Sequence, residues 1–288
     1  MQTRRLSSAS RASRKLELKF TRFVGVSLGG GKSDKACVAV LEYYPEHQKV
    51  FLSRLFEKIK TEGEISADLK IHEVLEAHQE GLHAVAFDVP LQMPKCIRCP
   101  LPCPGYERCT EPEIKWMWKW THSRNSKKRP KKLFTPYTQS CSEMYVQTEL
   151  EEPFILSDTL GSNIAPLVAR AHFIKRRFGH RAISIHPKLS IWRIGRSLKV
   201  AKSHLRHHRH SVGGDESRHI ILEALSKNNV AFMYHQDLKA MVENSHAFEA
   251  FICALTVFLR YRGQTEKRPL DFPKEEEWLE FPISHIKW

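Results

Sequence analysis

The sequence, 288 residues long, predicts a mixed α/β fold, and three observations indicate this class. Three β-rich runs, FVGVSL, KACVAVLEYY and KVFLSRLFEKI, follow one another with short polar turns between them, as in an antiparallel meander. A helix pattern and a short apolar strand come directly after the meander. Further helix patterns, one of them strongly apolar, occupy the second half of the chain.

The elements after the meander begin with residues 66–80, whose apolar residues recur at helical spacing before a glycine that ends the helix. The segment HAVAFDV (83–89) is a short apolar strand that carries one carboxylate, Asp88. Three strands, a helix and a fourth strand are the opening order of the ribonuclease H-like fold. We therefore expect an α/β protein of the ribonuclease H-like class, with an antiparallel meander followed by parallel strands in one mixed sheet that is flanked by helices.

Five further segments complete the expected order of elements. A helix pattern spans 155–179, and the strand AISIHP follows at 182–187. A basic linker is expected at 193–218, the helix HIILEALSKNN at 219–229 and a strongly apolar buried helix at 246–262.

This order divides the chain into a core and three additions. The core comprises residues 20–91 and 141–262. Residues 92–140 interrupt it with prolines, cysteines and tryptophans, which indicates an insertion on the surface. Residues 1–19 are basic and serine-rich without apolar periodicity and are expected to be disordered, and residues 263–288 form a C-terminal extension.

The net charge of +14 is concentrated in three segments. Lys and Arg outnumber Asp and Glu by six to one in residues 1–19, by eleven to three in 92–140 and by twelve to two in 175–218. Positive patches favour a polyanionic partner, so we expect the chain to bind nucleic acid, either DNA or RNA. A generally solvated basic surface is the alternative. The sequence has no run of eighteen apolar residues and no secretory signal, so we expect a cytoplasmic protein with no membrane partner.

Four of the seven cysteines, Cys96, Cys99, Cys103 and Cys109, lie within fourteen residues and alternate with prolines and a glycine. This spacing suits a metal site better than a disulfide framework, which indicates a reducing compartment. Four thiolates can hold zinc or an iron–sulfur cluster, and zinc is favoured because the spacing departs from the ferredoxin patterns. Free thiols in a loop are the alternative.

Three tryptophans, Trp116, Trp118 and Trp120, precede a basic run, and together they pair stacking surfaces with charge that neutralises phosphate. The basic run contains Lys127, Lys128, Arg129, Lys131 and Lys132. A strand that packs every second residue against the core, followed by a solvated loop, is an equally good interpretation.

Two other motifs carry weaker signals. The run HLRHHRH (204–210) follows no metal-ligand spacing and is interpreted as basic surface, so Arg206 and Arg209 join the candidate contacts to nucleic acid. The turn GGGK (29–32) lacks the spacing and the following helix of a Walker phosphate loop. Its backbone amides can still face a phosphate, which leaves nucleotide binding as a further hypothesis.

The apolar helix at 246–262 carries a narrow polar stripe formed by Glu249, Cys253, Thr256 and Arg260. A carboxylate on such a helix is costly to bury unless a cation or a donor meets it. Ordinary pairing of Glu249 with Arg260 or another base is the alternative to a functional role.

As a set, several motifs resemble a family of bacterial proteins of unknown function that are described as predicted nucleases with a ribonuclease H-like fold. The resemblance spans residues 22–282. It rests on GVSLGGGKSDK, AFDVPL, the cysteine block, FTPYTQ, LGSNIAPLVARA, IHPKLSIWRIGRSL, GGDESRHIILEAL and HAFEAFICALT.

The resemblance implies a nuclease in which carboxylates on the first strand, at the end of the fourth strand and on the last helix hold Mg²⁺ or Mn²⁺. Asp88 matches the fourth-strand position and Glu249 the helix position. The first strand carries Ser27 where relatives have an aspartate, and the fifth strand ends at His186 where many have an acidic residue. Asp34 is a substitute ligand from the hairpin.

Three functions follow as hypotheses. The first is a metal-dependent nuclease that hydrolyses phosphodiester bonds in DNA or RNA, impaired by Ser27. The second is a nucleic-acid-binding protein without catalysis that keeps the four-cysteine site. The third is a nucleotide-binding protein that uses the GGGK turn.

Overall fold

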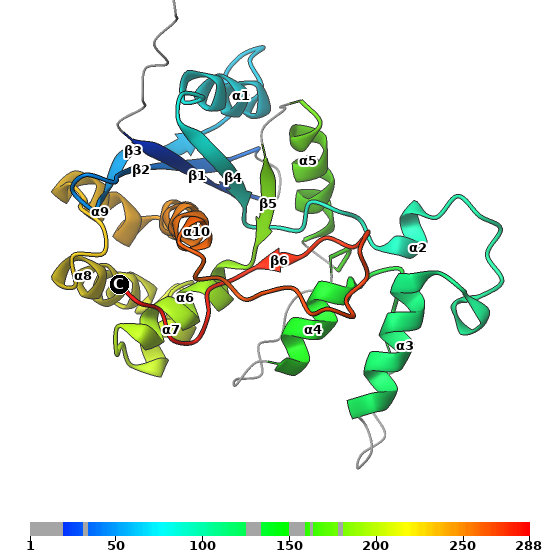
Figure 1. Ribbon diagram of the computed structural model, residues 1–288. Coiled ribbons are helices and arrows are strands. Elements are labelled where there is room, and N and C mark those ends of the chain that lie inside the picture. The colour runs from blue at the N-terminus through cyan, green and yellow to red at the C-terminus, as the bar shows by residue number, and fades with distance from the viewer. Residues whose placement is uncertain (1–19, 31–33, 125–133, 150–158, 162–163, 178–180) are drawn as a thin grey trace, which may run out of the picture.

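The computed structural model describes residues 20–30, 34–124, 134–149, 159–161, 164–177 and 181–288. Its centre is a six-stranded sheet with the order β3-β2-β1-β4-β5-β6 (Figure 1). The strands are β1 (Thr21–Leu28), β2 (Ala36–Tyr44), β3 (Lys49–Ile59), β4 (Leu82–Phe87), β5 (Ala182–Ile185) and β6 (Leu279–Glu280). The pairs β1–β2 and β2–β3 are antiparallel, and the pairs β1–β4, β4–β5 and β5–β6 are parallel. The expected meander followed by parallel strands is confirmed.

Helices cover both faces of the sheet (Figure 1). They are α1 (Ala67–Ala77), α2 (Lys95–Arg98), α3 (Pro112–Arg124), α4 (Cys141–Glu149), α5 (Ala165–Lys175), α6 (Pro187–Ser197), α7 (Lys202–His207), α8 (Gly214–Lys227), α9 (His235–Glu243) and α10 (Ser245–Tyr261), with a short 3₁₀ turn η1 (Tyr106–Arg108). Alternation along β1 sends Val24 and Val26 into one apolar cluster with α1 and α5. Phe23 enters the other cluster, with α6, α8 and α10.

The apolar helix expected at 246–262 is confirmed as α10, which lies against the centre of the sheet and is buried along nearly its whole length. Asn244 caps its first turn by accepting hydrogen bonds from the backbone N–H groups of His246 and Ala247. The close approach to β1 requires a glycine, because a Cβ atom on Gly25 would lie 2.0 Å from the carbonyl oxygen of Ala250. This contact brings the N-terminal half of α10 to the ends of the central strands.

Residues 92–124 contain α2, η1 and α3 and extend away from the sheet beside α4 (Figure 1). The interpretation of the three tryptophans as a strand is wrong, because they lie on helix α3. Trp116 and Trp120 are one helical turn apart and stack with ring centroids 4.7 Å apart, while Trp118 donates a hydrogen bond to the carbonyl of Tyr106. Pro112 at the helix start and the helix-forming residues between the tryptophans favour this outcome.

The basic linker expected at 193–218 is also wrong, because that segment contains the end of α6, all of α7 and the start of α8. Helix α6 buries Ile191 and Trp192 in the core, and Leu205 of α7 packs on it. Gly195 allows this packing, since a Cβ atom there would lie 2.2 Å from Leu205 Cδ2. Most charged side chains of this segment are exposed, although Arg193 and Arg218 are buried, and this mixture hides the apolar pattern in the sequence.

Two other segments differ from expectation. The described part of the helix expected at 155–179 begins only at Ala165, after a turn at 159–161. Residues 263–288 supply β6, which pairs with β5 at the edge of the sheet. This last segment therefore completes the sheet and lies beside the cavity described below.

Within the described part of the chain, no single helix is long and apolar enough to cross a membrane. Helices α9 and α10 reach that length and composition only as a pair, and the pair is bent by 117°.

Candidate functional site

The site begins where the parallel strands β1 and β4 end side by side. Ser27, fully buried near the end of β1, donates a hydrogen bond of 2.6 Å to Asp88 Oδ2, directly after β4. The backbone N–H of Leu28 donates to the other oxygen, Oδ1, at 3.1 Å. Ser27 and Asp88 are thus adjacent, and the two contacts fix the orientation of the Asp88 carboxylate.

Helix α10 adds two side chains to this pair, His246 and Glu249. The Nδ1 atom of His246 lies 2.9 Å from Ser27 Oγ. Because the single hydroxyl hydrogen of Ser27 goes to Asp88, we infer that His246 donates from Nδ1 and keeps a lone pair on Nε2. Oxygen and nitrogen atoms of Asp88, His246 and Glu249, one from each, lie within 4.8 Å of one another. The structure therefore assembles two carboxylates and one imidazole at a single point.

Glu249 is fully buried, and a basic pair from the turn after α7 compensates its charge. Arg209 makes a bidentate ion pair with both carboxylate oxygens, and His208 Nε2 lies 3.2 Å from Oε1. Burial alone would raise the pKa of Glu249, but the hydrogen bonds from His208 and Arg209 hold it down to about 2.

The interpretation of 204–210 as basic surface is thus wrong for His208. His208 is buried, and Arg209 is directed at Glu249, with 43% of its side chain exposed. Arg260, the partner considered for Glu249 in the sequence, pairs with Glu280 instead at 2.7 Å.

The ionisation of Asp88 differs from that of Glu249. Burial and the negative charge of Glu249 raise the pKa of Asp88 to about 7, against a usual value near 4. Burial also lowers the pKa of His246. At neutral pH, Asp88 is therefore present in both its protonated and its ionised form. A cation close to the carboxylate would favour the ionised form.

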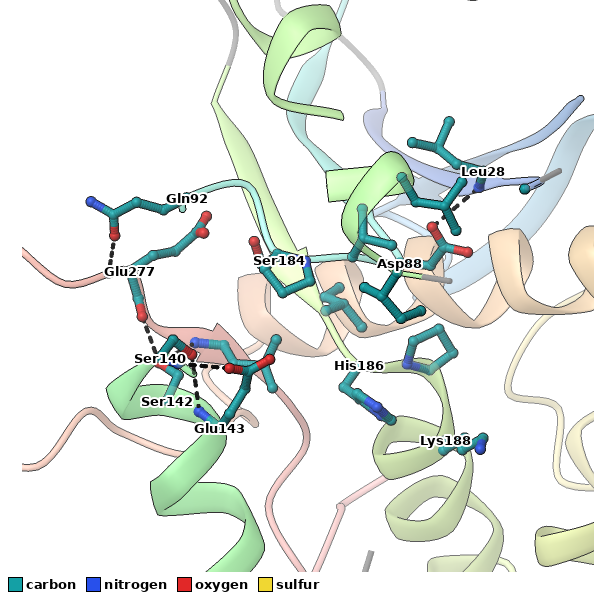
Figure 2. Close-up of a pocket in the computed structure, with 18 of the residues that line it drawn as sticks. Leu28, Asp88, Gln92, Ser140, Ser142, Glu143, Ser184, His186, Lys188 and Glu277 are labelled. Atoms are coloured by element: carbon teal, nitrogen blue, oxygen red, sulfur yellow. Dashed lines mark hydrogen bonds between the residues drawn. The ribbon is translucent and has the colours of Figure 1, made fainter. Parts of the chain in front are cut away.

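Asp88, His246 and Arg209 line a cavity of about 610 Å³ (Figure 2). His186, at the junction of β5 and α6, and Lys188 border the same end of the cavity. The Nδ1 atom of His186 is buried and has no hydrogen-bond partner within the described part of the protein. Burial and the charges of Lys188 and Arg209 lower the pKa of His186 to about 3, so its imidazole is neutral.

The opposite end of the cavity is acidic and is built by α4 and the C-terminal segment. Figure 2 shows Ser140, Ser142, Glu143 and Glu277 gathered there, away from His186 and Lys188. Glu276 also lines it, and burial raises its pKa to about 7; burial likewise raises the pKa of Glu277. The cavity thus has a cationic end at Arg209 and an acidic end at Glu277.

The remaining candidates lie outside this group or beyond the described residues. The side chain of Asp34 is exposed and is not a member of the carboxylate–imidazole group. Arg206 lies on α7 with its guanidinium 5.7 Å from the ring of Trp192. Residues 125–133, which include Lys127, Lys128, Arg129, Lys131 and Lys132, fall outside the described residues, as do Gly31 and Lys32 of the GGGK turn.

The tryptophans of α3 serve packing in this structure. Trp116 is 5% exposed and belongs to a small apolar cluster with Phe134 and Phe272. Trp118 and Trp120 are partly buried against the same cluster. Trp116 therefore has no free face to offer a nucleic-acid base.

The four cysteines of the 96–109 segment lie close in sequence but are not assembled as ligands. In the described part of the chain, the group of Asp88, His246 and Glu249 is the one set of three or more metal-capable side chains whose ligand atoms are mutually within 4.8 Å. Burial, with smaller contributions from Cys109, Cys103 and Cys99, raises the pKa of Cys96 to about 11. A bound metal would have to draw the sulfur atoms together.

Sequence reasoning missed His246, His208 and the acidic end of the cavity, and it named Arg209 as a contact to nucleic acid without its ion pair to Glu249. His246 stands three residues before Glu249, a spacing that places both on one face of a helix, so this signal was available. Glu276 and Glu277 gave no signal, because their position depends on how the C-terminal segment returns to the sheet.

The fold and the site together define a mixed α/β protein with a polar cluster at the carboxyl ends of its central strands. The model of a family described as proteins of unknown function, DUF429, matches residues 36–274, and the chain belongs to this family. No curated protein and no solved structure matches the chain.

Proposed function

We propose that the protein is a ribonuclease H-like, divalent-metal-dependent phosphodiesterase that acts on nucleic acid, with its centre at Asp88, His246 and Glu249. The observation that carries the proposal is the convergence of these side chains beside a cavity that Asp88 and His246 line together with Arg209 and Lys188. The strand order supports it, because an antiparallel meander followed by parallel strands is the expected arrangement of that class. Ligand sites at the carboxyl ends of strands are common in α/β proteins.

The donor set fits a divalent transition metal better than Mg²⁺. An imidazole nitrogen beside carboxylate oxygens suits Mn²⁺ or Zn²⁺, whereas Mg²⁺ prefers oxygen ligands alone. Asp88 and His246 are the principal donors. The inferred tautomer of His246 supports this role, since metal-binding histidines usually donate their other ring N–H, here to Ser27.

In this proposal, the guanidinium of Arg209 stands in place of the second metal ion of a two-metal site. A two-metal site needs several carboxylates to hold two positively charged ions close together. Here the negative charge of Glu249 is already neutralised by the guanidinium of Arg209. We therefore propose one metal ion and one arginine at the centre. When bound, the ion would activate a water molecule and stabilise the leaving oxygen.

The side chains of this protein would supply positioning and charge. Arg209 can contact a phosphate oxygen from its exposed edge while it holds Glu249, because its five donors form a planar fork. Lys188 adds a second positive charge at the same end of the cavity. The concentration of Lys and Arg in the chain would add long-range attraction for a polyanion.

A cleavage assay tests the proposal. Labelled single- and double-stranded DNA, RNA and hybrids are incubated with the full chain in Mn²⁺, in Mg²⁺ and in a chelator. We expect cleavage with Mn²⁺ that the chelator stops and Asp88→Asn abolishes. The matched control Asp271→Asn, at an exposed carboxylate that pairs with Lys119, should cleave like the parent. Activity that persists in Asp88→Asn would overturn the proposal.

Nucleic-acid binding without cleavage is the second candidate function. Ser27 favours it, because a serine brings no negative charge to a position where a ligand carboxylate is expected. The ion pair between Glu249 and Arg209 also favours it, because it engages the Glu249 carboxylate. Tight, salt-sensitive binding with no cleavage under any of the metal conditions would support it.

A structural metal at Cys96, Cys99, Cys103 and Cys109 remains a separate proposal. The segment has little regular structure, and a metal bound by four thiolates would supply folding energy to it directly. Zinc is favoured, and elemental analysis together with the visible spectrum separates zinc from an iron–sulfur cluster.

A further inference from the structure

We propose that the cavity beside Asp88 receives one nucleotide of the substrate, with its phosphate at Arg209 and Lys188 and its base at Glu277. This inference rests on the proposed function for its substrate class and goes beyond it by assigning a base-recognition site. The cavity volume of about 610 Å³ lies within the range of roughly 300–1,000 Å³ typical of small-molecule pockets.

The walls of the cavity suit the flat faces of a base and a sugar. They include Val89, Pro90, Ile164, Pro166, Leu167 and Pro187. Enzymes that act on a single nucleotide within a strand commonly extrude its base into such a pocket, where it is held by apolar contacts and by hydrogen bonds to its edge.

The two ends of the cavity match the two ends of a nucleotide. Arg209 and Lys188 present positive charge on the side of Asp88, where a phosphate would lie for cleavage. Glu277 lies at the other end, close to the segment that contains Ser140 and Ser142 (Figure 2). A phosphate would be repelled from that acidic end, so the ligand has one favoured direction.

Glu277 is held in place by contacts at its side chain and its backbone. Its Oε2 atom accepts a hydrogen bond of 2.9 Å from the backbone N–H of Leu91. Its backbone N–H donates to Gln92 Oε1 at 2.6 Å, and its carbonyl accepts from the hydroxyl of Ser142. A carboxylate fixed in this way is preorganised to read a ligand.

A fixed carboxylate selects among bases by their hydrogen-bond donors. Guanine presents two adjacent donors, its ring N1–H and its exocyclic amino group, and a carboxylate can accept both. Uracil presents one ring N–H flanked by two carbonyl oxygens, which a carboxylate would repel. Sites built around a fixed polar partner reject ligands that lack the matching group strongly. We therefore expect guanine to be preferred over uracil.

An unpartnered group within the cavity independently points to a ligand. The Nδ1 atom of His186 is buried without a hydrogen-bond partner among the described residues, and the side chain lines the cavity at the same end as Asp88. A buried polar atom that lacks a partner costs about 1–3 kcal/mol, which a bound ligand can recover by supplying one. The sugar hydroxyl of a nucleotide is a suitable partner.

Calorimetric titration of the full chain in a chelator tests the inference without cleavage. We expect GMP to bind at least tenfold more tightly than UMP. Glu277→Gln keeps a carbonyl oxygen that can accept the hydrogen bond from the backbone N–H of Leu91, but it replaces the other carboxylate oxygen with an amino group. The variant can therefore no longer accept two hydrogen bonds from guanine, and the preference for GMP should be lost. Lys188→Ala should weaken both nucleotides by a similar factor. Glu223→Gln, at an exposed carboxylate on α8, is the matched control and should change neither affinity.

Competition by single-stranded oligonucleotides with and without one guanine shows whether the site accepts a strand as well as a free mononucleotide. Displacement of GMP only by the guanine-containing strand is the expected result. Equal affinity for GMP and UMP, or an unchanged preference in Glu277→Gln, would overturn the inference even if the protein cleaves nucleic acid. Selective GMP binding without any cleavage would leave the inference standing and remove the nuclease proposal.

Discussion

Arg209 forms a bidentate ion pair with Glu249, the fully buried carboxylate at the centre of the site. A buried carboxylate without such a partner would be protonated or would destabilise the fold. The pair therefore explains how α10 can carry Glu249 into the core. It also places a permanent positive charge within reach of Asp88, whose own pKa is raised by burial and by Glu249.

Removal of the guanidinium should destabilise the protein in a way that metal reverses. We expect Arg209→Ala to cost about 3 kcal/mol of unfolding free energy, at the low end for a broken buried ion pair because Arg209 is 43% exposed. Mn²⁺ should restore part of the loss by meeting the charge of Glu249. Urea unfolding with and without Mn²⁺ measures both effects. Arg196→Ala, at an exposed arginine on α6, should show neither, and an equal loss in that control would contradict the account.

A carboxylate in place of Ser27 should make the thermal stability of the protein depend on bound metal. In a chelator, Ser27→Asp brings a second negative charge against Asp88 in a fully buried position, so the melting temperature should fall. With Mn²⁺ it should recover, and cleavage should rise at least about tenfold, or roughly 1.4 kcal/mol of transition-state stabilisation. Ser27→Asn, similar in size but neutral, is the control. A metal response in Ser27→Asn equal to that of Ser27→Asp would count against a ligand role for this position.

Metal affinity should depend on pH through Asp88. The folded-state pKa of Asp88 is about 7, so the proton competes with metal below that value and is absent above it. Mn²⁺ affinity should therefore rise between about pH 6 and pH 8. Asp88→Asn should abolish this pH dependence together with most of the affinity. Titrations at several pH values provide the measurement, and an affinity that stayed constant across this range would show that Asp88 is not a ligand.

The contact between β1 and α10 should be essential for the site. A methyl group on Gly25 would lie 2.0 Å from the Ala250 carbonyl, which forces the helix away from the sheet. We expect Gly25→Ala to destabilise the protein by about 1–3 kcal/mol or more, the usual range for overpacking. Gly30→Ala is the control, because its methyl group would lie 3.6 Å from the nearest atom outside its immediate chain neighbours. Midpoints of urea unfolding that are equal for the two variants would refute the steric argument.

The parts of the fold that could be predicted from sequence are those in which local pattern and burial agree. Strands β1, β2 and β4 are apolar runs with clear turns, and α10 has a continuous apolar face, so their positions were correct. Asp88 stood out because a lone carboxylate ended an apolar strand. Its neighbour Ser27 was named only through the resemblance, as the residue at the position where relatives have an aspartate, and the structure places it 2.6 Å from Asp88.

The rest depended on tertiary contacts that leave little trace in the sequence. Tryptophans at every second position fit a strand and a helix equally well, and packing against Phe272, far along the chain, adds to the local signals that favour the helix. Arg209 lies in a run of basic residues typical of an exposed surface, and its role is set by the turn that follows α7. Strand β6 is two residues long and has no periodicity of its own.

Direct titration of Mn²⁺ into the full chain, stripped of metal and followed by calorimetry, tests the central claim most closely. We expect one equivalent of Mn²⁺ to bind at Asp88, His246 and Glu249, with the affinity greatly reduced in both Asp88→Asn and His246→Ala and unchanged in Asp271→Asn. Replacement of the four clustered cysteines by serine in a folded variant should leave this equivalent in place. Absence of Mn²⁺ binding by the parent chain, or equal binding by Asp88→Asn, would contradict it.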